Sequence, residues 1–582
     1  MTKAVLIFTF SPVQSFIAEA RRSEDLFNGS AILSRLAQAA GKAIQTAGEL
    51  IYPAQLQEND TPNVLVARVS QEQAPEIAQK ARQALLKEWQ EIAEKARAEA
   101  YLEEDDLWKR IWKRQVVEAP PWQIFWAVAP ETENYAQAYE AARDLLERAK
   151  RSRLFDQSEE EGEKDSLSGA RTALRTQKYA TARKYWEAMS RRPHILSSQV
   201  RPEGRELLDS IALVKRFWEV GDREFPSTST VAAWDFYLEA QKKAPEELSR
   251  YRQALESLPL YKARKHVTAF PYDGDLFFEE TLTRQRMEDS YNVEKVDEAA
   301  LQQVRELLKK LIKKTGKSPS PYYMLIQFDG DGVGAKIDHL LENKGKAEAN
   351  HRCFSENIAR FSNQVREVVK PEAGGFLIYN GGDDVLFLAS REKGLELSRK
   401  LAEEYQNTVG KDLGILATAS AGVVIAHHLT PLARALSLLH EAEKSAKSGK
   451  KDDLGNKGMV CVTLAKRGGE ALSALSPWEH VKKFEVWVRA FQNEEVAAVF
   501  PYALAREAAA LQGLEQEAMA SLVRYLFSRH TGEKVSKDRK HELLKTLTEW
   551  HKAIEEKTGV SAMGEIARWL IIARFLASGG AE

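Results

Sequence analysis

The feature that most constrains the fold is a short acidic turn between two apolar runs. The runs are GFLIY at 375–379 and VLFLA at 385–389, and NGGDD at 380–384 joins them. Asn-Gly between apolar runs is a strong hairpin signal, because both turn residues adopt positive φ at low cost. The segment therefore predicts a β-hairpin with Asp383 and Asp384 at its turn.

Strands and helices alternate on both sides of this hairpin. A strand is expected at 322–328 (YYMLIQF), and the acidic sequence DGDG follows it directly. The other periodic segments predict helices at 347–369, 392–406 and 431–448, and strands at 417–426 and 459–464. The order is β-α-β-β-α-β plus one strand, which predicts a ferredoxin-like sheet with its helices on one face.

A similar series of elements opens the chain. The pattern predicts strands at 4–9, 63–69 and 122–128, and helices at 30–48 and 73–115. The two series suggest a diverged internal duplication. Their chemistry differs, because alignment of the first strands sets Ser11 near Asp329 and the first series has no acidic hairpin.

The length of 582 residues gives a prior of roughly four domains at ~150 residues each. The fold class expected is α+β multidomain, with two ferredoxin-like domains, an intervening mostly helical domain and a C-terminal helical bundle. The predicted boundaries are 1–135, 136–318, 319–468 and 469–582, and the last segment is expected to be helical throughout.

The composition excludes several classes of protein. The 84 Lys and Arg residues balance 85 Asp and Glu, so a net charge of −1 argues against nucleic-acid binding by bulk charge alone. No apolar run reaches the ~18 residues of a membrane span, and residues 4–10 lack a basic leader, so a cytoplasmic protein is expected. Cys353 and Cys461 are too few for a disulfide framework or a four-cysteine zinc site.

Carboxylates occur where the expected topology brings strand ends together. Asp329 and Asp331 leave the first strand of the second series, and Asp383 and Asp384 lie in the hairpin whose strands flank it. Oxygen ligands in this arrangement suit Mg²⁺ or Mn²⁺. Two such ions about 3.5 to 4 Å apart serve phosphodiester synthesis from a nucleoside triphosphate. The alternative is a surface hairpin with two acidic turn residues, which the flanking apolar runs and the upstream DGDG disfavour.

Glycines and lysines near these acids are candidates for nucleotide contacts. Gly381 and Gly382 would allow a triphosphate or base to approach the backbone, and Gly330 is assigned to the same pocket. Lys447 and Lys450 follow a predicted helix and are candidates for the triphosphate, although lysines there also complement the helix dipole.

Other motifs give weaker signals. The glycines at 330, 332 and 334 match neither a dinucleotide fingerprint nor a P-loop. His427 and His428 follow a strand without a further His or Cys at zinc-ligand spacing, which favours a structural role.

Four motifs in order resemble those of a known family. They are SPVQSFIAEARRSEDLFNGSAILS from residue 11, FPSTSTVAAWDF at 225–236, FDGDGVGAKI from residue 328 and YNGGDDVLFL from residue 379. Together they resemble the large subunit of type III CRISPR effector complexes, the Cas-ten family in its Cmr-two form (subtype III-B). The resemblance covers residue 3 to about 470 and implies two palm domains with an intervening and a C-terminal helical domain.

The resemblance also implies an activity and partners. ATP would be converted to cyclic oligoadenylate when the guide RNA pairs with a target RNA, in a complex with backbone, small and guide-handle-binding subunits. Asp383 and Asp384 would bind the catalytic metals, with Asp329 as third ligand and Asp331 as a further candidate. In the first palm, the turn from Ser11 to Gln14 would help hold the second nucleotide.

Two departures from the family pattern change these expectations. The chain starts at the first palm strand and contains no His-Asp dipeptide, so no HD-type cleavage of single-stranded DNA is expected. Asp165 stands where the family's zinc knuckle has a cysteine, so no structural zinc is expected.

Two other functions share these features. One is a scaffold subunit of the same complex whose palm binds nucleotide without turnover, although adjacent acids repel each other without metal. The other is a free-standing nucleotide cyclase, which has no need of the long helical regions.

Overall fold

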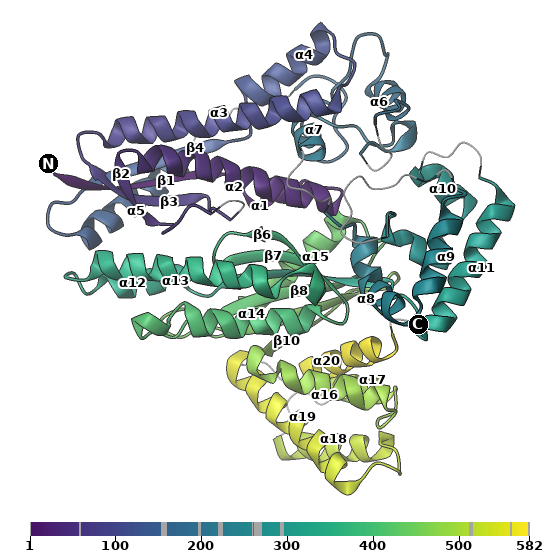
Figure 1. Ribbon diagram of the computed structural model, residues 1–582. Coiled ribbons are helices and arrows are strands. Elements are labelled where there is room, and N and C mark those ends of the chain that lie inside the picture. Colours follow the sequence, from purple (N-terminus) through teal and green to yellow (C-terminus); the bar gives the residue numbers. More distant parts are fainter. Residues whose placement is uncertain are drawn as a thin grey trace.

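The computed structural model describes most of the chain. The described residues are 2–57, 60–152, 160–195, 199–218, 225–258, 260, 270–291, 296–510, 516–558 and 562–579. Figure 1 shows the N-terminal sheet domain, the second sheet domain beside it, and two helical groups at the periphery.

The first sheet domain has ferredoxin-like topology. Its four antiparallel strands stand in the order β2-β3-β1-β4. The strands are β1 (Lys3–Ser11), β2 (Gly48–Tyr52), β3 (Val64–Ser70) and β4 (Gln123–Pro130). Its helices are α1 (Gln14–Ala18), α2 (Ser23–Gln45), α3 (Ala74–Ala100), α4 (Asp106–Lys113), a π-helical turn (Arg114–Glu118) and α5 (Tyr135–Arg151). The three predicted strands are confirmed, and β2 is an additional strand that the sequence pattern did not indicate.

The single helix predicted at 73–115 is wrong, because the chain breaks it after Ala100. Tyr101 adopts a left-handed conformation with φ 42°, which ends α3. Asp105 then accepts a hydrogen bond from the Trp108 backbone N–H and begins α4. The left-handed conformation of Tyr101 and the cap at Asp105 therefore divide a segment whose apolar period is continuous.

The second sheet domain contains the acidic hairpin. Its six strands stand in the order β10-β9-β8-β5-β7-β6. They are β5 (Tyr322–Gly330), β6 (Gly375–Asn380), β7 (Asp384–Ser390), β8 (Ala419–His427), β9 (Met459–Ala465) and β10 (Leu472–Pro477). The helices are α12 (Val333–Leu341), α13 (Ala347–Val368), α14 (Gly394–Thr408) and α15 (Leu432–Ala446). All five strands predicted here are confirmed.

Two predictions for this domain are wrong. Helices cover both faces of the sheet, because α15 connects the parallel strands β8 and β9 and packs opposite α13 and α14. Residues 469–582 are not helical throughout, because β10 pairs antiparallel with β9. The sheet therefore continues past the predicted boundary at residue 468.

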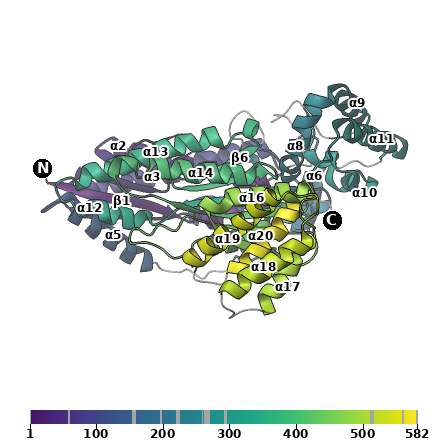
Figure 2. The ribbon, with the colours of Figure 1, turned by 90° about the horizontal axis from the view of Figure 1, so that it is seen from below.

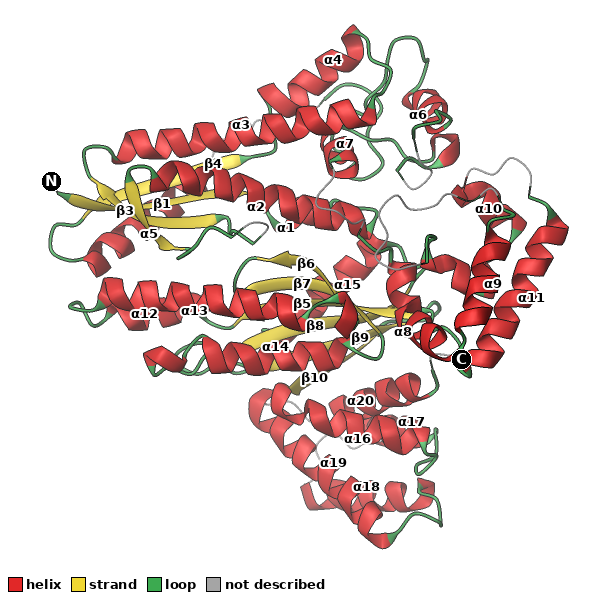
Figure 3. Ribbon diagram, in the orientation of Figure 1, coloured by secondary structure: helices red, strands yellow, loops and turns green. Residues whose placement is uncertain are grey.

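The two sheet domains pack through elements of both. Helix α2 of the first contacts β6 of the second, and α13 of the second contacts β2 of the first. Figure 3 shows β6 on the side of the second sheet that lies toward α2, and the hairpin between β6 and β7 contacts the first domain, because Asn380 donates to Asp60.

The remaining helices form two groups. Residues between the sheet domains form α6 (Ala182–Ser190), α7 (Ser210–Phe217), α8 (Thr228–Lys243), α9 (Pro245–Leu255), α10 (Arg284–Tyr291) and α11 (Glu298–Thr315), with 3-10 turns at Pro202–Gly204, Gly274–Phe277 and Glu279–Thr281. The C-terminal group has α16 (Val481–Gln492), α17 (Phe500–Ala510), α18 (Gln516–His530), α19 (Lys537–Thr558) and α20 (Ala562–Ala577). Further 3-10 turns lie at Pro371–Ala373, Lys411–Leu413 and Trp478–His480.

The C-terminal helices are attached to the edge of the second sheet. Trp550 donates its indole N–H to Ser476 Oγ at 2.8 Å, and Trp569 donates to the Leu475 carbonyl at 3.0 Å. Figure 2 shows this group on one side of the sheets, with α9–α11 at the end of the molecule. The edge strand β10 is thereby covered.

Candidate active site

Three predicted acidic residues meet at one end of the second sheet. Asp329 near the end of β5 is the cross-strand partner of Asp384 at the start of β7. The Gly330 backbone N–H donates to the Asp383 carbonyl at 3.0 Å. Cross-strand neighbours have Cα atoms ~4.5–5.5 Å apart, so these side chains share one site. The topology predicted this convergence.

Burial makes these carboxylates costly to ionise. It raises the pKa of Asp383 to about 7, with a further contribution from the Asp329 charge. The pKa of Asp384 lies well above its usual range because of burial and the charges of Asp329 and Asp383. Gln327 donates a side-chain hydrogen bond to Asp384 and so orients it. The cluster has too little positive charge of its own, which fits hard divalent cations.

Lys447 is the cationic side chain beside this cluster. Its Nζ lies 2.9 Å from Asp329 Oδ2 and 2.6 Å from Glu443 Oε1. These carboxylates raise the pKa of Lys447 above its usual value despite partial burial. Even with this ion pair, burial keeps the pKa of Asp329 raised. Lys447 therefore lies where the sequence placed it, beside the acidic residues.

Glu443 was missed by the sequence analysis. Its side chain is only 10% exposed, and its charge contributes to the raised pKa values of Asp329 and Asp384. The available signal was the spacing of Glu443 and Lys447, four residues apart on the helix that follows β8. Glu443 is a fourth carboxylate that could hold a metal.

Asp331 accepts its hydrogen bonds from side-chain and backbone groups outside the acidic cluster. Its carboxylate accepts hydrogen bonds from Thr418 Oγ1 at 2.7 Å and Ser420 Oγ at 2.8 Å. It also accepts from the backbone N–H groups of Lys457 at 3.1 Å and Gly458 at 2.8 Å. Four protein donors satisfy both oxygens, so the structure does not present Asp331 as a metal ligand.

The glycines are required by close packing around the hairpin. A Cβ on Gly330 would lie 2.2 Å from the Tyr405 hydroxyl, and one on Gly381 would lie 2.0 Å from the Tyr379 hydroxyl. Gly382 has φ +102°, and a Cβ there would lie 2.7 Å from Ile358. Neighbouring side chains therefore account for these glycines before any nucleotide contact is considered.

Lys450 and the first-domain turn are placed differently from the prediction. Lys450 donates to the Glu556 carbonyl of α19 at 3.3 Å, away from the acidic cluster. Ser11 ends β1 opposite Gln123, and Gln14 begins α1. Within the described ranges, neither Ser11 nor Gln14 has a hydrogen bond to the acidic hairpin.

Other first-domain residues contact the hairpin instead. Asp60, from the β2–β3 connection, accepts from Asn380 Nδ2 at 3.1 Å and pairs with Arg366. The Tyr52 hydroxyl lies 3.6 Å from where a Cβ on Gly382 would be. The Asp383 charge contributes to the raised pKa of Tyr52. The first domain therefore braces the hairpin through the end of β2 and the loop that follows.

The segment compared with a zinc knuckle contains a hydrogen-bonded turn. Asp165 Oδ1 accepts from the backbone N–H groups of Leu167 at 2.8 Å and Ser168 at 2.6 Å.

Elsewhere, Glu280 approaches both His427 and His428, at 3.5 Å from each Nε2. No helix in the part of the chain that the structure describes is long and apolar enough to cross a membrane.

Two family descriptions match segments of the chain. Residues 322–455 match Cas10/Cmr2, second palm domain, and residues 5–94 match CRISPR-associated protein Cmr2, N-terminal. A curated relative, the CRISPR system Cmr subunit Cmr2 of Pyrococcus furiosus, is 30% identical over 236 residues. That alignment covers 36% of this chain and 26% of the relative, so the chain matches about a quarter of the relative's length.

Two solved structures have a similar fold. The type III-B Cmr-beta structure in the apo state matches with TM-score 0.63 and 13% identity, over 93% of this chain and 78% of that chain. The type III-B Cmr-beta structure bound to cognate target RNA matches with TM-score 0.65 and 12% identity, over 98% of this chain and 83% of that chain. At these identities the likeness concerns the fold.

Proposed function

We propose that the chain is a member of the Cas10/Cmr2 family, whose descriptions match residues 322–455 and 5–94, and that its second palm is a metal-dependent nucleotidyltransferase. It converts ATP to cyclic oligoadenylate as the large subunit of an RNA-guided type III-B effector complex. The observation that carries this proposal is the group of buried carboxylates at the β5 and β7 strand ends, which a single lysine does not neutralise.

The acidic cluster is suited to hold divalent cations and a triphosphate. Asp329, Asp383 and Asp384 would hold Mg²⁺ or Mn²⁺, with Glu443 as a further oxygen ligand. When bound, these ions would polarise phosphate oxygens and favour a deprotonated 3′-hydroxyl. Gln327 orients Asp384, and the tight hairpin fixes Asp383 relative to Asp329. The 3′-hydroxyl of one ATP attacks the α-phosphate of a second, and pyrophosphate leaves.

Lys447 is the residue proposed to bind the triphosphate. Its two carboxylate partners carry the charge that divalent ions would neutralise, which would free the ammonium group for phosphate oxygens. Lys450 is held by the C-terminal helices and is the weaker of the two candidates. The glycines at 330, 381 and 382 keep the backbone close to this site.

The first palm is proposed to help hold the second nucleotide. The turn from Ser11 to Gln14 was the expected contact, and Tyr52 beside Gly382 is the better supported one. An aromatic ring at this place could stack on a base.

The partners proposed are the backbone, small and guide-handle-binding subunits, the guide RNA and the target RNA. The C-terminal group supports a protein contact, because Tyr502 and Tyr525 of its helices and Val499 in the turn before α17 are exposed. The near-neutral net charge fits a subunit that senses RNA together with neighbours.

The non-catalytic scaffold is the second candidate, and the ion pair of Lys447 with Asp329 favours it. This pair neutralises part of the cluster without any metal.

One experiment separates these functions. The assembled complex is incubated with labelled ATP, Mg²⁺ or Mn²⁺ and target RNA, and the products are compared with those of Asp383→Ala and Asp384→Ala. RNA-dependent cyclic product that both substitutions abolish supports the proposal. Product from the isolated chain without RNA indicates a free-standing cyclase, and no product under any condition indicates the scaffold.

A further inference from the structure

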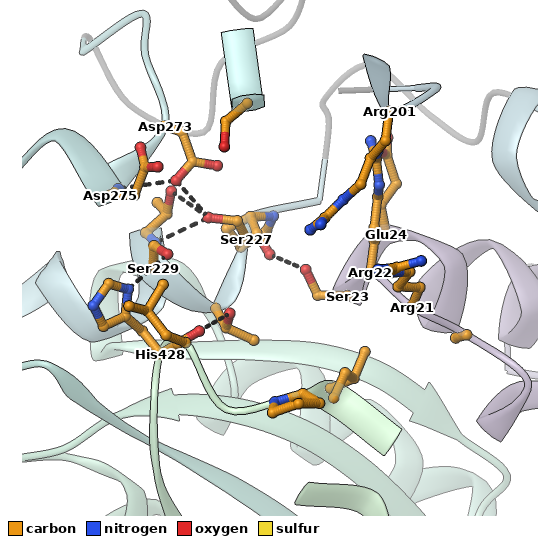
Figure 4. Close-up of a pocket in the computed structure, with 18 of the residues that line it drawn as sticks. Arg21, Arg22, Ser23, Glu24, Arg201, Ser227, Ser229, Asp273, Asp275 and His428 are labelled. Atoms are coloured by element: carbon orange, nitrogen blue, oxygen red, sulfur yellow. Dashed lines mark hydrogen bonds between the residues drawn. The ribbon is translucent and has the colours of Figure 1, made fainter. Parts of the chain in front are cut away.

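A cavity lies where three parts of the chain meet. Its volume is about 860 Å³, within the ~300–1,000 Å³ range of small-molecule pockets. Its walls come from the α1–α2 connection, the loop that precedes α8, the segment around Asp273 and the β8–α15 connection (Figure 4). Two of the sequence motifs, RRSED at 21–25 and FPSTST at 225–230, therefore contribute to a site other than the acidic cluster.

This cavity is separate from the catalytic cluster. His428 lines it, and the preceding residue, His427, pairs with Tyr322 at the beginning of β5. Asp329 lies seven residues further along that strand, roughly 24 Å away at ~3.4 Å per residue. The two sites lie at opposite ends of the same sheet.

One wall of the cavity is rich in arginine. Arg21, Arg22 and Arg201 line it, and Figure 4 shows Arg201 above Arg21 on the same side. Neither Arg21 nor Arg201 has a side-chain hydrogen bond or ion pair within the ranges that the structure describes. The pKa of Arg201 is lowered by partial desolvation and by the charges of Arg21 and Arg286, although Glu206 opposes this. Arg286 lies beside Asp275, and its Nε is buried without a hydrogen-bond acceptor among the residues that the structure describes.

The opposite wall offers hydrogen-bond acceptors. Asp273 accepts from Ser227 Oγ at 2.9 Å and from the Asp275 backbone N–H at 2.9 Å. Asp275 accepts from the Tyr291 hydroxyl, and its other oxygen lies 3.5 Å from Arg286. Figure 4 places Asp273 and Asp275 across the cavity from Arg201.

The two walls are held together by the FPSTST loop. Ser23 Oγ donates to the Pro226 carbonyl at 2.6 Å, which joins α2 to this loop. Ser229 Oγ lies 2.9 Å from His428 Nδ1, which joins the loop to the second palm. The spacing between the arginine wall and the aspartate wall is therefore set by packed secondary structure.

We propose that this cavity binds a phosphorylated ribonucleotide, with its phosphate against Arg21 and Arg201 and its ribose hydroxyls toward Asp273. Guanidinium groups bind phosphate oxygens through charge-assisted hydrogen bonds, and an anion relieves their mutual repulsion. A carboxylate opposite them accepts from ribose hydroxyls, as acidic residues do in dinucleotide sites. The phosphate can belong to a free nucleotide or to the 5′ end of an RNA.

The test measures binding without metal, so it does not depend on catalysis. The full chain carrying Asp383→Asn and Asp384→Asn is titrated in EDTA with AMP, adenosine, 2′-deoxy-AMP and short RNAs with a 5′-phosphate or a 5′-hydroxyl. We expect one AMP per chain, with adenosine and 2′-deoxy-AMP each weaker by about tenfold. Tighter binding of the 5′-phosphorylated RNA than of AMP identifies an RNA end as the source, and the reverse identifies a free nucleotide.

Substitutions assign the binding to this cavity. Arg201→Gln, at an exposed side chain, and Arg21→Ala should each weaken AMP about tenfold, and Asp273→Asn should reduce the preference for AMP over 2′-deoxy-AMP. Arg250→Ala, at an exposed arginine of α9 outside the cavity, is the matched control and should bind AMP normally. Absence of AMP binding in EDTA, or binding that Arg201→Gln leaves unchanged while thermal unfolding is normal, overturns the proposal.

Discussion

The two palms use the same connection of the ferredoxin-like fold for different purposes. In the second palm, the β6–β7 hairpin presents Asp383 and Asp384 beside Asp329. In the first palm, the corresponding β2–β3 connection contributes Asp60, which pairs with Arg366 and accepts from Asn380. Asn380 directly precedes the two glycines of the acidic hairpin. The first palm therefore contributes its acidic residue as a brace for the second.

The palms also differ in how their buried charges are neutralised. On the first palm's α2, Asp25 shares Arg216 with Glu206, at 2.6 and 3.0 Å, and all three side chains are at most 2% exposed. In the acidic cluster of the second palm, Lys447 pairs with Asp329 and Glu443, and Asp383 and Asp384 have no ion pair among the residues that the structure describes. A buried ion pair that is satisfied internally has no charge left for a ligand, whereas an under-neutralised cluster attracts cations. The two domains therefore differ in the placement of arginines as much as in that of aspartates.

Removing one carboxylate should have the largest effect. Asp384→Asn is expected to lower nucleotidyl transfer by at least about a hundredfold, because a metal ligand and its charge are lost. The same change should raise the metal-free melting temperature, because a buried repelling charge disappears. Product formation and thermal unfolding in EDTA check the two expectations. Activity within tenfold of the original chain would show that the second palm's acids are not the catalytic ones.

Lys447 should matter more than its neighbour Lys450. Lys447→Ala is expected to raise the KM for ATP by roughly tenfold, because a charge-assisted contact to the triphosphate is lost. Lys450→Ala is the matched control, since its ammonium group contacts α19, and a change below about twofold is expected. Steady-state kinetics of the assembled complex measure both. Equal changes in KM for the two substitutions would contradict the proposal that Lys447, and not Lys450, contacts the triphosphate.

The brace between the palms should appear in stability. Asp60→Ala is expected to lower the free energy of unfolding by about 2 kcal/mol, because Asn380 and Arg366 each lose a hydrogen-bond acceptor. Asp412→Ala removes an exposed pair with Arg360 and should cost about 0–1 kcal/mol. Urea unfolding of both variants compares them. If the costs are the same, Asp60 does not support the hairpin.

The alternation of apolar runs predicted the second palm well. Its five predicted strands and the meeting of Asp329 with the hairpin follow from period and turn chemistry, which are local signals. The strand β2 was missed because GELIY is short and its first residue, Gly48, is also the last residue of the helix predicted at 30–48. The break between α3 and α4 was missed because capping at Asp105 interrupts a continuous apolar period.

The contacts that depend on tertiary packing could not be predicted. Asp331 looked equivalent to Asp329, but strand alternation and the loop before β9 give it four donors of its own. Asp60 and Asn380 are 320 residues apart, and no local pattern relates them. Lys450 lies three residues beyond Lys447, past the end of α15, and the chain there turns toward α19.

The metal-free chain should lose stability as pH rises. Burial raises the pKa of Asp383 from 3.8 to about 7. Between about pH 4 and pH 7 the folded state therefore binds more protons than the unfolded state, so the free energy of unfolding falls with rising pH. Melting temperatures in EDTA across this range should decrease, and Asp383→Asn should reduce the slope. An unchanged slope in that variant would place the titrating group elsewhere.

The smallest effect is expected when a carboxylate is added to the first palm. Ser11→Asp places the residue type of Asp329 at the corresponding strand end, but Asp60, the carboxylate that the structure describes in the β2–β3 connection, is held by Arg366 and Asn380. We expect a change in stability within about 0.5 kcal/mol and no additional Mn²⁺ bound per chain. Mn²⁺ titration followed by electron paramagnetic resonance measures the stoichiometry. An additional bound ion would mean that the first palm lacks only one residue of a metal site. The pairing of Asp60 with Arg366 would then not explain the difference in metal binding between the two palms.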